Sequence, residues 1–336
     1  MAPARTWEIV SVSLPNSPFA NTSISSRPVL LSRVMSRYVA LVCLAPPDPH
    51  LLARAAGRYC AEHCRAVIFY GPPPLVRLSM LLKDKVCVIA GAASLRGIGY
   101  ATAELFASHG AKITVLDAVM NEGVASEIQR EIEHELARTV DMHAVRCDIS
   151  NIGDCRQAME LTVSQFGTVD CLINCAAVVM SQPLLSIEEK DYDRVLGVNL
   201  KGAFNLCRTV LEVFAPRKSG AIVNIASVAA QRGGGLVGGA HYAASKGGVI
   251  SLTRSIAREF GPMGIRANVV CPSMTDTAML DGNVSEEQHR EIAAAIPLRR
   301  AGKARDVAGA CLFLASDLAA YVTGATLDVN GGSHIH

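Results

Sequence analysis

From Lys85 onward, short runs of apolar and β-branched residues alternate with amphipathic stretches of ten or more residues. This alternation is typical of a parallel sheet whose strands are joined by helices. We expect strands at residues 86–90, 112–117, 141–146, 169–174, 221–226, 266–270 and 326–329. Helices fit at 97–109, 119–137, 152–166, 191–214, 242–260 and 304–315, with Gly110, Gly167 and Gly261 as expected C-caps. The pattern predicts an α/β fold with a doubly wound parallel sheet of about seven strands, flanked by helices on both faces.

Composition excludes several classes of function. Half of the 336 residues are apolar, which is ample for a buried core, and the net charge is only +2. Neither a nucleic-acid groove nor a polybasic membrane patch is expected from so balanced a charge. The eleven cysteines are odd in number, scattered and placed in apolar runs. We therefore expect reduced, buried thiols and a cytoplasmic location.

Residues 1–79 differ in character from the rest of the chain. They carry eight Arg, no Lys and three acids, a net charge of +5, so the remainder carries −3. Two interpretations stay open: an organelle-targeting presequence, or a poorly ordered extension that includes a mis-assigned start. We favour the second, because Met80 directly precedes the lead-in to the first strand. We expect the catalytic domain to span residues 80–336.

Two features of this N-terminal segment carry no predicted site. The apolar stretch from Tyr38 to Ala45 is far too short to span a bilayer. Cys60, His63 and Cys64 lie close together, but no second pair of ligands is nearby, so we predict no metal site.

A glycine-rich turn follows the first strand and opens a helix. Gly91, Gly97 and Gly99 would let the backbone approach a pyrophosphate, whose charge meets the N-terminus of the helix. About twenty residues further on, the second strand ends at Asp117, where a carboxylate can accept from both ribose hydroxyls of NAD. The order of strand, turn, helix, strand and acid predicts a dinucleotide site.

Tyr242 and Lys246 are one helical turn apart and share a helix face. An ammonium beside a phenol favours the phenolate, so we expect Lys246 to lower the pKa of Tyr242 towards neutrality. The spacing alone is weak evidence, since such pairs are more often found on a helix surface.

Taken in order, these motifs resemble the short-chain dehydrogenase/reductase family, from Met80 to about Gly332. The family's usual nucleotide motif is Thr-Gly-x-x-x-Gly-x-Gly, whereas here five residues rather than three separate Gly91 from Gly97. The resemblance implies a Rossmann-type fold and a catalytic set of Asn199, Ser227, Tyr242 and Lys246. It implies cofactor contacts from Gly91, Ser94, Arg96, Gly97, Ile98, Gly99, Asp117, Asp148, Ile149, Asn174, Ala176, Tyr242, Lys246, Pro272 and Thr277.

The same resemblance assigns roles to the individual residues. Tyr242 would be the general acid and base, Lys246 would lower its pKa and hold the cofactor ribose, and Ser227 would orient the substrate oxygen. Asn199 would hold a water in a proton relay to the lysine. Asp148 would lie against the adenine ring, and Thr277 would contact the nicotinamide carboxamide.

The chain departs from the family pattern at three positions. Cys175 and Ala177 stand where the family has Asn and Gly, and Ser273 follows Pro272 in place of glycine. A thiol cannot replace the hydrogen bonds of an amide, so contacts at the nicotinamide ribose are affected, but not the fold.

Two segments are expected to shape the substrate site. Residues 231–239 hold five glycines and predict a mobile stretch near the entrance. Residues 276–296 resemble the family's variable lid, with Met279 and Leu280 as apolar walls, or else form an ordinary surface helix.

The expected reaction is hydride transfer between NAD or NADP and a small-molecule secondary alcohol or ketone. Asp117 favours NAD, while Arg96 could pair with a 2′-phosphate of NADP or with Asp117 itself. An NADPH-dependent 3-oxoacyl-type ketoreductase is the alternative, although basic residues for an acidic carrier are few beyond Arg299, Arg300 and Lys303. A non-catalytic dinucleotide-binding sensor is disfavoured because the four catalytic positions are all present. Resemblance of residues 199–214 and 242–260 to the family's interface helices implies a homodimer or homotetramer.

Overall fold

The computed structural model describes residues 80–234, 237–282 and 284–335, together with three short strands nearer the N-terminus. The chain divides into two compact units, Met1–Ser79 and Met80–His336. In the first unit, β3 (Val67–Tyr70) pairs antiparallel with β1 (Glu8–Val10) and parallel with β2 (Ala40–Val42). The rest of that unit, which holds most of the predicted extension or presequence and Cys60, His63 and Cys64, lies outside the described residues.

A seven-stranded parallel sheet forms the centre of the second unit. Its strands are β4 (Val86–Ala90), β5 (Lys112–Asp117), β6 (Met142–Arg146), β7 (Cys171–Asn174), β8 (Gly220–Ile225), β9 (Ile265–Pro272) and β12 (Thr326–Val329). They lie in the order β12-β9-β8-β7-β4-β5-β6. The chain runs outward from β4 in both directions, so the order reverses between β4 and β7. In open sheets of this kind ligands bind at that reversal, beyond the carboxyl ends of the strands.

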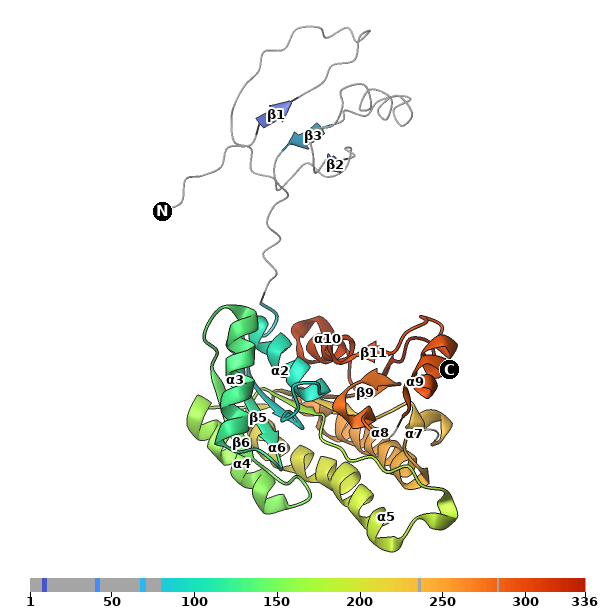
Figure 1. Cartoon of the computed structure of the whole chain (residues 1–336). Coiled ribbons are helices and arrows are strands. Elements are labelled where there is room, and N and C mark those ends of the chain that lie inside the picture. Colours follow the sequence, from blue (N-terminus) through green and yellow to red (C-terminus); the bar gives the residue numbers. More distant parts are fainter. Residues whose placement is uncertain are drawn as a thin grey trace, which may run out of the picture. The chain divides into compact units, whose positions relative to one another are not determined.

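Helices cover the sheet on both faces and enclose two separate cores (Figure 1). On one face lie α2 (Ile98–Ser108), α3 (Glu122–Leu136) and α10 (Ala304–Ala315). On the other lie α4 (Ile152–Phe166), α6 (Gly202–Arg217) and α8 (Ala240–Phe260). Successive residues of β4 alternate between the cores, because side chains along a strand point to opposite faces. A strand buried on both faces explains the unbroken apolar run from which it was predicted.

The predicted doubly wound fold is confirmed, with differences in detail. The helix expected at 191–214 is divided into α5 (Glu189–Leu196), a π-helical turn at Gly197–Lys201, and α6. The predicted lid, residues 276–296, starts at the end of a short strand β10 (Thr275–Asp276), which pairs with β11 (Gly302–Lys303), and contains the helix α9 (Glu286–Ala295). A short helix α7 (Ala229–Arg232) follows β8. Single 3₁₀ turns lie at Leu184–Ser186, Gly261–Met263, Ala278–Leu280 and Asp317–Ala319.

The expected glycine caps are confirmed at two of three helix ends. Gly110 and Gly167 have φ of 85° and 82°, the left-handed conformation that ends a helix. Gly261 is different: its φ is −53°, and the chain continues through a 3₁₀ turn to Gly264, where φ is 72°. The left-handed residue therefore comes three positions later than predicted.

The described cysteines are all unpaired, and all but Cys175 are buried. Within the same part of the chain, none of the helices has both the length and the apolar character needed to cross a bilayer.

The space around one glycine of α2 and one glycine of α10 predicts opposite effects for the same substitution on the two helices. A Cβ at Gly99 would lie 2.2 Å from the carbonyl oxygen of Gly91, whereas a Cβ at Gly309 would meet nothing within 4 Å. We expect Gly99→Ala to lower the free energy of unfolding by about 1 to 3 kcal/mol. Gly309→Ala should raise it by about 0.5 to 1 kcal/mol, since alanine favours a helix. Urea unfolding of the full chain measures both, and a shift of the same sign in the two variants would contradict the packing.

Candidate active site

The turn that leaves β4 is closed in by backbone. Gly91 has φ of 78°, and a Cβ there would lie 2.6 Å from the Cα of Ala176, in the loop that follows β7. Its N–H donates to the carbonyl oxygen of Leu116 at 2.8 Å. Only glycine fits this conformation and this contact, so the sequence predicted the bend correctly.

The helix that follows offers its N-terminus to an anion. Gly97 is the N-cap of α2, with an extended backbone and no capping side chain, and the first turn of the helix has no acidic residue. Close contact of Gly99 with Gly91 folds the turn back over this end of the helix. A helix N-terminus without a capping group presents N–H donors and a positive dipole end. The cradle therefore fits the diphosphate of a dinucleotide.

Asp117 ends β5 and binds this same turn. Its Oδ2 accepts from the Ala93 N–H at 3.1 Å, and its Oδ1 accepts from the Val119 N–H at 3.2 Å. The carboxylate thus helps to fix the lengthened loop. Each carboxylate oxygen can accept more than one hydrogen bond, so ribose hydroxyls could still be bound there.

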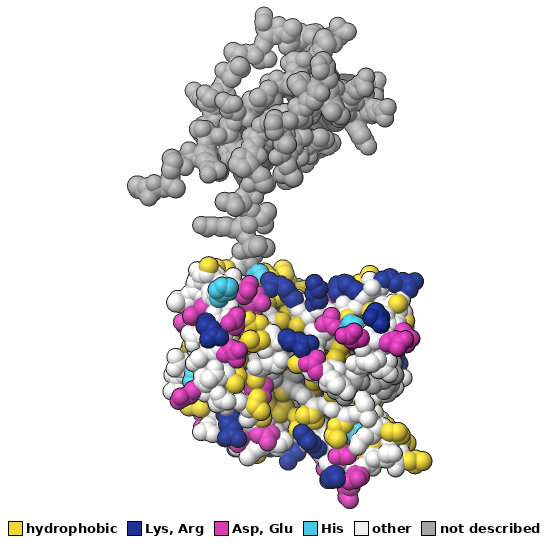
Figure 2. Space-filling view, in the orientation of Figure 1, with side chains coloured by type: hydrophobic (Ala, Val, Ile, Leu, Met, Phe, Trp, Pro, Cys, Tyr) yellow, Lys and Arg dark blue, Asp and Glu magenta, His cyan; other side chains and the backbone are white. Residues whose placement is uncertain are grey.

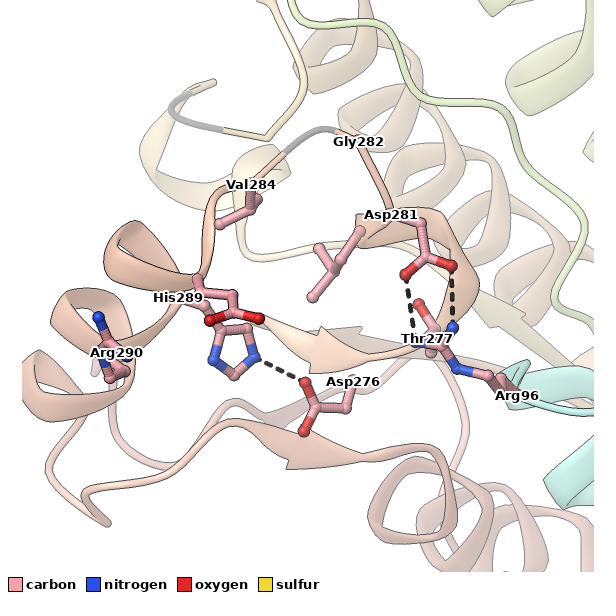
Figure 3. Close-up of a pocket in the computed structure, with 10 residues that line it drawn as sticks. Arg96, Asp276, Thr277, Asp281, Gly282, Val284, His289 and Arg290 are labelled. Atoms are coloured by element: carbon pink, nitrogen blue, oxygen red, sulfur yellow. Dashed lines mark hydrogen bonds and ion pairs between the residues drawn. The ribbon is translucent and has the colours of Figure 1, made fainter.

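Arg96 lies on the turn and pairs with a residue that the sequence did not indicate. Its guanidinium binds Asp281 through two hydrogen bonds, of 2.9 Å and 3.1 Å (Figure 3). The expected partner within the protein, Asp117, is instead held by backbone N–H groups. Asp281 directly follows the 3₁₀ turn at residues 278–280, so the ion pair joins the glycine-rich turn to the predicted lid.

A pocket of about 570 Å³ lies between this turn and the lid. Two predicted cofactor residues, Arg96 and Thr277, line it, together with Leu280. Leu280 was predicted as an apolar wall. On the lid side, His289 binds Asp276 at 2.7 Å, so α9 is tied to β10 (Figure 3).

A second cavity of similar volume, about 570 Å³, opens beside Lys85, Asp170 and Arg266. These residues lie just before, or at the start of, strands β4, β7 and β9. The cavity therefore lies at the amino-terminal edge of the sheet and contains none of the predicted site residues.

The predicted catalytic side chains converge at the carboxyl end of β8. Ser227 follows that strand, and the Tyr242 phenol, only 8% exposed, makes a hydrogen bond with the Ser227 side chain. Lys246 lies one turn further along α8, with its Nζ 5.9 Å from the centroid of the Tyr242 ring. The same Nζ donates to the carbonyl oxygen of Ile225 at 2.8 Å, which holds the lysine against the end of β8.

Burial controls the ionisation of this pair. Desolvation raises the pKa of Tyr242, while the hydrogen bond with Ser227 lowers it in part. Burial also lowers the pKa of Lys246 to about 8. The expectation that the lysine would bring the phenol's pKa down is therefore wrong for the protein alone, because taking both groups out of water favours the neutral form of each.

Asn199 is fully buried in the π-helical turn, and its amide is bound to protein. Oδ1 accepts from the Val178 N–H at 2.9 Å, while Nδ2 donates to the Val178 carbonyl at 3.0 Å and to Ser245 Oγ at 3.1 Å. Ser245 Oγ in turn donates to the carbonyl of Tyr242 at 2.7 Å. Both N–H groups of the side chain are used in these contacts, and the water relay expected for Asn199 stays a prediction. Asn199 therefore joins the loop after β7 to α8.

The remaining predicted cofactor residues are arranged around the same edge of the sheet. Asn174 is buried, and its Nδ2 donates to Asn224 Oδ1 at 3.2 Å, so the side chain links the neighbouring strands β7 and β8. Asp148 is exposed and accepts from the backbone and hydroxyl of Ser150. Ile149 is buried under Gly202. The others flank the strand ends and the glycine-rich turn: Ser94, Ile98, Ala176 and Pro272.

Comparisons with known proteins agree with this geometry. The sequence model of the family described as Enoyl-(Acyl carrier protein) reductase matches residues 91–334. A Sinorhizobium fredii protein, "Uncharacterized short-chain type dehydrogenase/reductase y4mP", is 46% identical over 259 residues, which are 76% of this chain and 100% of the relative. The chain belongs to the short-chain dehydrogenase/reductase family. It is therefore an oxidoreductase of the type that uses NAD or NADP.

Other members of the short-chain dehydrogenase/reductase family extend the comparison. The 3-oxoacyl-[acyl-carrier-protein] reductase FabG of Thermotoga maritima is 37% identical over 253 residues, covering 75% of this chain and 99% of the relative. The solved structure of gox2181 has a TM-score of 0.71 at 30% identity and covers 76% of this chain and 97% of its own. That of levodione reductase has a TM-score of 0.70 at 30% identity, covering 75% and 98%.

Sequence reasoning missed three residues at this dehydrogenase/reductase site. Ser245 lies inside the Tyr-x-x-x-Lys motif, and a hydroxyl in a helix interior was a usable signal. Gly238 has φ of 88°, and a Cβ there would lie 2.4 Å from Tyr242 Cδ1. Any other residue at this position would press on the Tyr242 ring. Asp281 is 185 residues from Arg96, and nothing local in the sequence indicates that they pair.

The burial of Lys246 predicts a pH effect on stability. Because the folded protein releases this proton near pH 8, the unfolded chain binds more protons between about pH 8 and 10. Stability must therefore rise with pH through this group. We expect the free energy of unfolding in urea, compared between pH 7.5 and 9.5, to rise by about 1 to 2 kcal/mol more in the wild type than in Lys246→Met.

The comparison with Lys246→Met serves as the control. Buried thiols that do not interact with Lys246, such as Cys207, whose pKa burial raises to about 12, oppose this trend equally in both proteins and cancel in the difference. Identical pH responses in the two proteins would contradict a desolvated lysine.

Proposed function

We propose that the chain interconverts a small secondary alcohol and its ketone by hydride transfer, with Tyr242 as general acid and base. The observation that carries this proposal is the meeting of Tyr242, Ser227 and Lys246 at the carboxyl end of β8. Open α/β sheets bind their ligands at this edge. The dinucleotide cradle at the end of β4 belongs to the same edge of the sheet.

The chemistry requires a proton to move on the substrate oxygen while hydride moves on the carbon. Tyr242 would take that proton in oxidation and return it in reduction. Ser227, already hydrogen-bonded to the phenol, would orient the substrate oxygen and stabilise the charge that develops on it. Asn199 would act as a positioning residue, holding α8 in place through Ser245.

The glycine-rich turn, the N-terminus of α2 and Asp117 would hold the dinucleotide, with Thr277 and Lys246 towards its nicotinamide half. When bound, the nicotinamide supplies the hydride acceptor or donor and, in its oxidised form, a positive charge. A positive charge favours the phenolate over the phenol. The raised pKa of Tyr242 therefore describes the protein alone and would fall when oxidised cofactor binds.

We favour NAD over NADP for this site. Asp117 ends the second strand of the fold, where a carboxylate binds ribose hydroxyls and repels a 2′-phosphate. Arg96, the basic residue that would support NADP, has its guanidinium engaged by Asp281.

A second candidate is reduction of a 3-oxoacyl group carried on an acidic carrier protein. It is supported by the likeness to FabG and by three exposed cations between α9 and α10, Arg299, Arg300 and Lys303. Figure 2 shows Lys and Arg side chains gathered along one edge of the second unit, beside α10 and β11. Asp306 lies 2.6 Å from the Arg300 guanidinium and partly neutralises it, so this edge would attract an acidic carrier protein less strongly.

We propose a homodimer or homotetramer in the cytoplasm. Large apolar side chains are exposed on and beside α5 and α6, among them Leu185, Tyr192 and Phe204, and a second copy would cover them. The unpaired state of the described cysteines is consistent with a reducing compartment.

Tyr242→Phe tests the proposed role of the phenol. It removes the proton-transferring hydroxyl and keeps the ring, so turnover should fall at least about a hundredfold, while the Kd for dinucleotide stays nearly unchanged. Tyr321→Phe is the matched control, because that side chain is fully exposed, and it should leave both quantities unaltered. Substantial turnover in Tyr242→Phe would refute the assignment.

A substrate panel separates the two candidate functions. Secondary alcohols, free ketones and 3-oxoacyl groups on carrier protein are each offered with NAD and NADP, and kcat/KM is compared. We expect free alcohols or ketones with NAD to give the highest values. Highest values for carrier-bound acyl groups, lowered by Arg299→Glu with Lys303→Glu, would favour the ketoreductase instead.

A further inference from the structure

The ion pair between Arg96 and Asp281 joins two parts of the chain that are 185 residues apart. The two hydrogen bonds, of 2.9 Å and 3.1 Å, use two N–H groups of one guanidinium and both oxygens of one carboxylate. This is the fork geometry that a guanidinium also uses to bind a phosphate. Figure 3 shows the two side chains meeting at the edge of the pocket.

The charges near this turn sum to a negative value. Asp117 binds the turn at Ala93, three residues before Arg96, and Asp281 is paired with Arg96 itself. Two carboxylates thus accompany one guanidinium. The other basic side chains that line the pocket in the described part of the chain, His289 and Arg290, lie on α9, and His289 is paired with Asp276.

We propose that Asp281 is a specificity-determining residue, which engages the Arg96 guanidinium and thereby disfavours the 2′-phosphate of NADP relative to NAD. The inference rests on the proposed dinucleotide function. The Asp281 carboxylate uses two of the five N–H groups and neutralises the guanidinium, so a phosphate must either displace it or bind the remaining N–H groups beside an existing negative charge. The displaced carboxylate also leaves its negative charge beside the incoming one.

The exposure of the pair sets the size of the effect. The side chains of Arg96 and Asp281 are 63% and 58% exposed, so water and salt weaken their attraction. Removing the charge of Asp281 should therefore tighten NADP binding about three- to tenfold. NAD, which has no phosphate for Arg96 to bind at the 2′ position, should change less than twofold.

The test is calorimetric titration of the full chain with NAD and with NADP, without substrate. The proteins are wild type, Asp281→Asn, Arg96→Gln and the double variant. Asp276→Asn is the matched control, since it removes one carboxylate from the same lid but from the pair with His289.

The expected result is a three- to tenfold fall in the Kd for NADP in Asp281→Asn, absent from Asp276→Asn and lost in the Arg96→Gln background. If Asp281→Asn changed the Kd for NAD and the Kd for NADP by the same factor, the inference would be overturned, because the pair would then only position the lid. An effect that persists without Arg96 would overturn it as well. Failure of the wild type to bind either dinucleotide would overturn the proposed function itself.

Discussion

The site depends on two glycines, Gly91 and Gly99, which lie where the backbone is too crowded for any side chain. Gly99 lies so close to Gly91, and Gly91 so close to the loop after β7, that a Cβ at either would overlap backbone atoms. That approach lets β4, which is buried on both faces, leave the sheet and enter α2 within a few residues. The end of a helix is thereby brought to the end of the central strand. Asp117 then fixes the lengthened turn from the neighbouring strand.

Desolvation, more than attraction between partners, governs the proton-transfer groups. Tyr242 and Lys246 are both buried, and burial pushes each towards its neutral form. The hydrogen bonds with Ser227 and with the carbonyl of Ile225 hold the two side chains in position without restoring the charge. The two side chains are therefore held in position before any ligand binds, and a bound ligand would set their charges. In the protein alone, burial keeps the Tyr242 phenol protonated.

The fold followed from the sequence because its determinants are local and periodic. The strands Val86–Ala90, Lys112–Asp117 and Thr326–Val329 have the predicted bounds, since apolar runs and turn residues mark their ends. The convergence of Ser227, Tyr242 and Lys246 could be inferred only through the family resemblance. The interactions of Arg96 and Asn199 could not be predicted. They depend on Asp281 and Val178, which are 185 and 21 residues away. The tertiary structure decides which of several possible partners such a side chain binds.

The π-helical turn at Gly197–Lys201 has a consequence for the phase of the helix in which it lies. A π turn holds an additional residue, and each residue advances a helix by about 100°, so the apolar stripe after the turn is rotated relative to the stripe before it. Before the turn, Val195 of α5 packs in the cluster that contains Tyr242. After it, Leu206 and Val210 of α6 pack in the core of the sheet. The rotation lets one continuous rod of helix face two different partners, with Asn199 at the point where the phase changes.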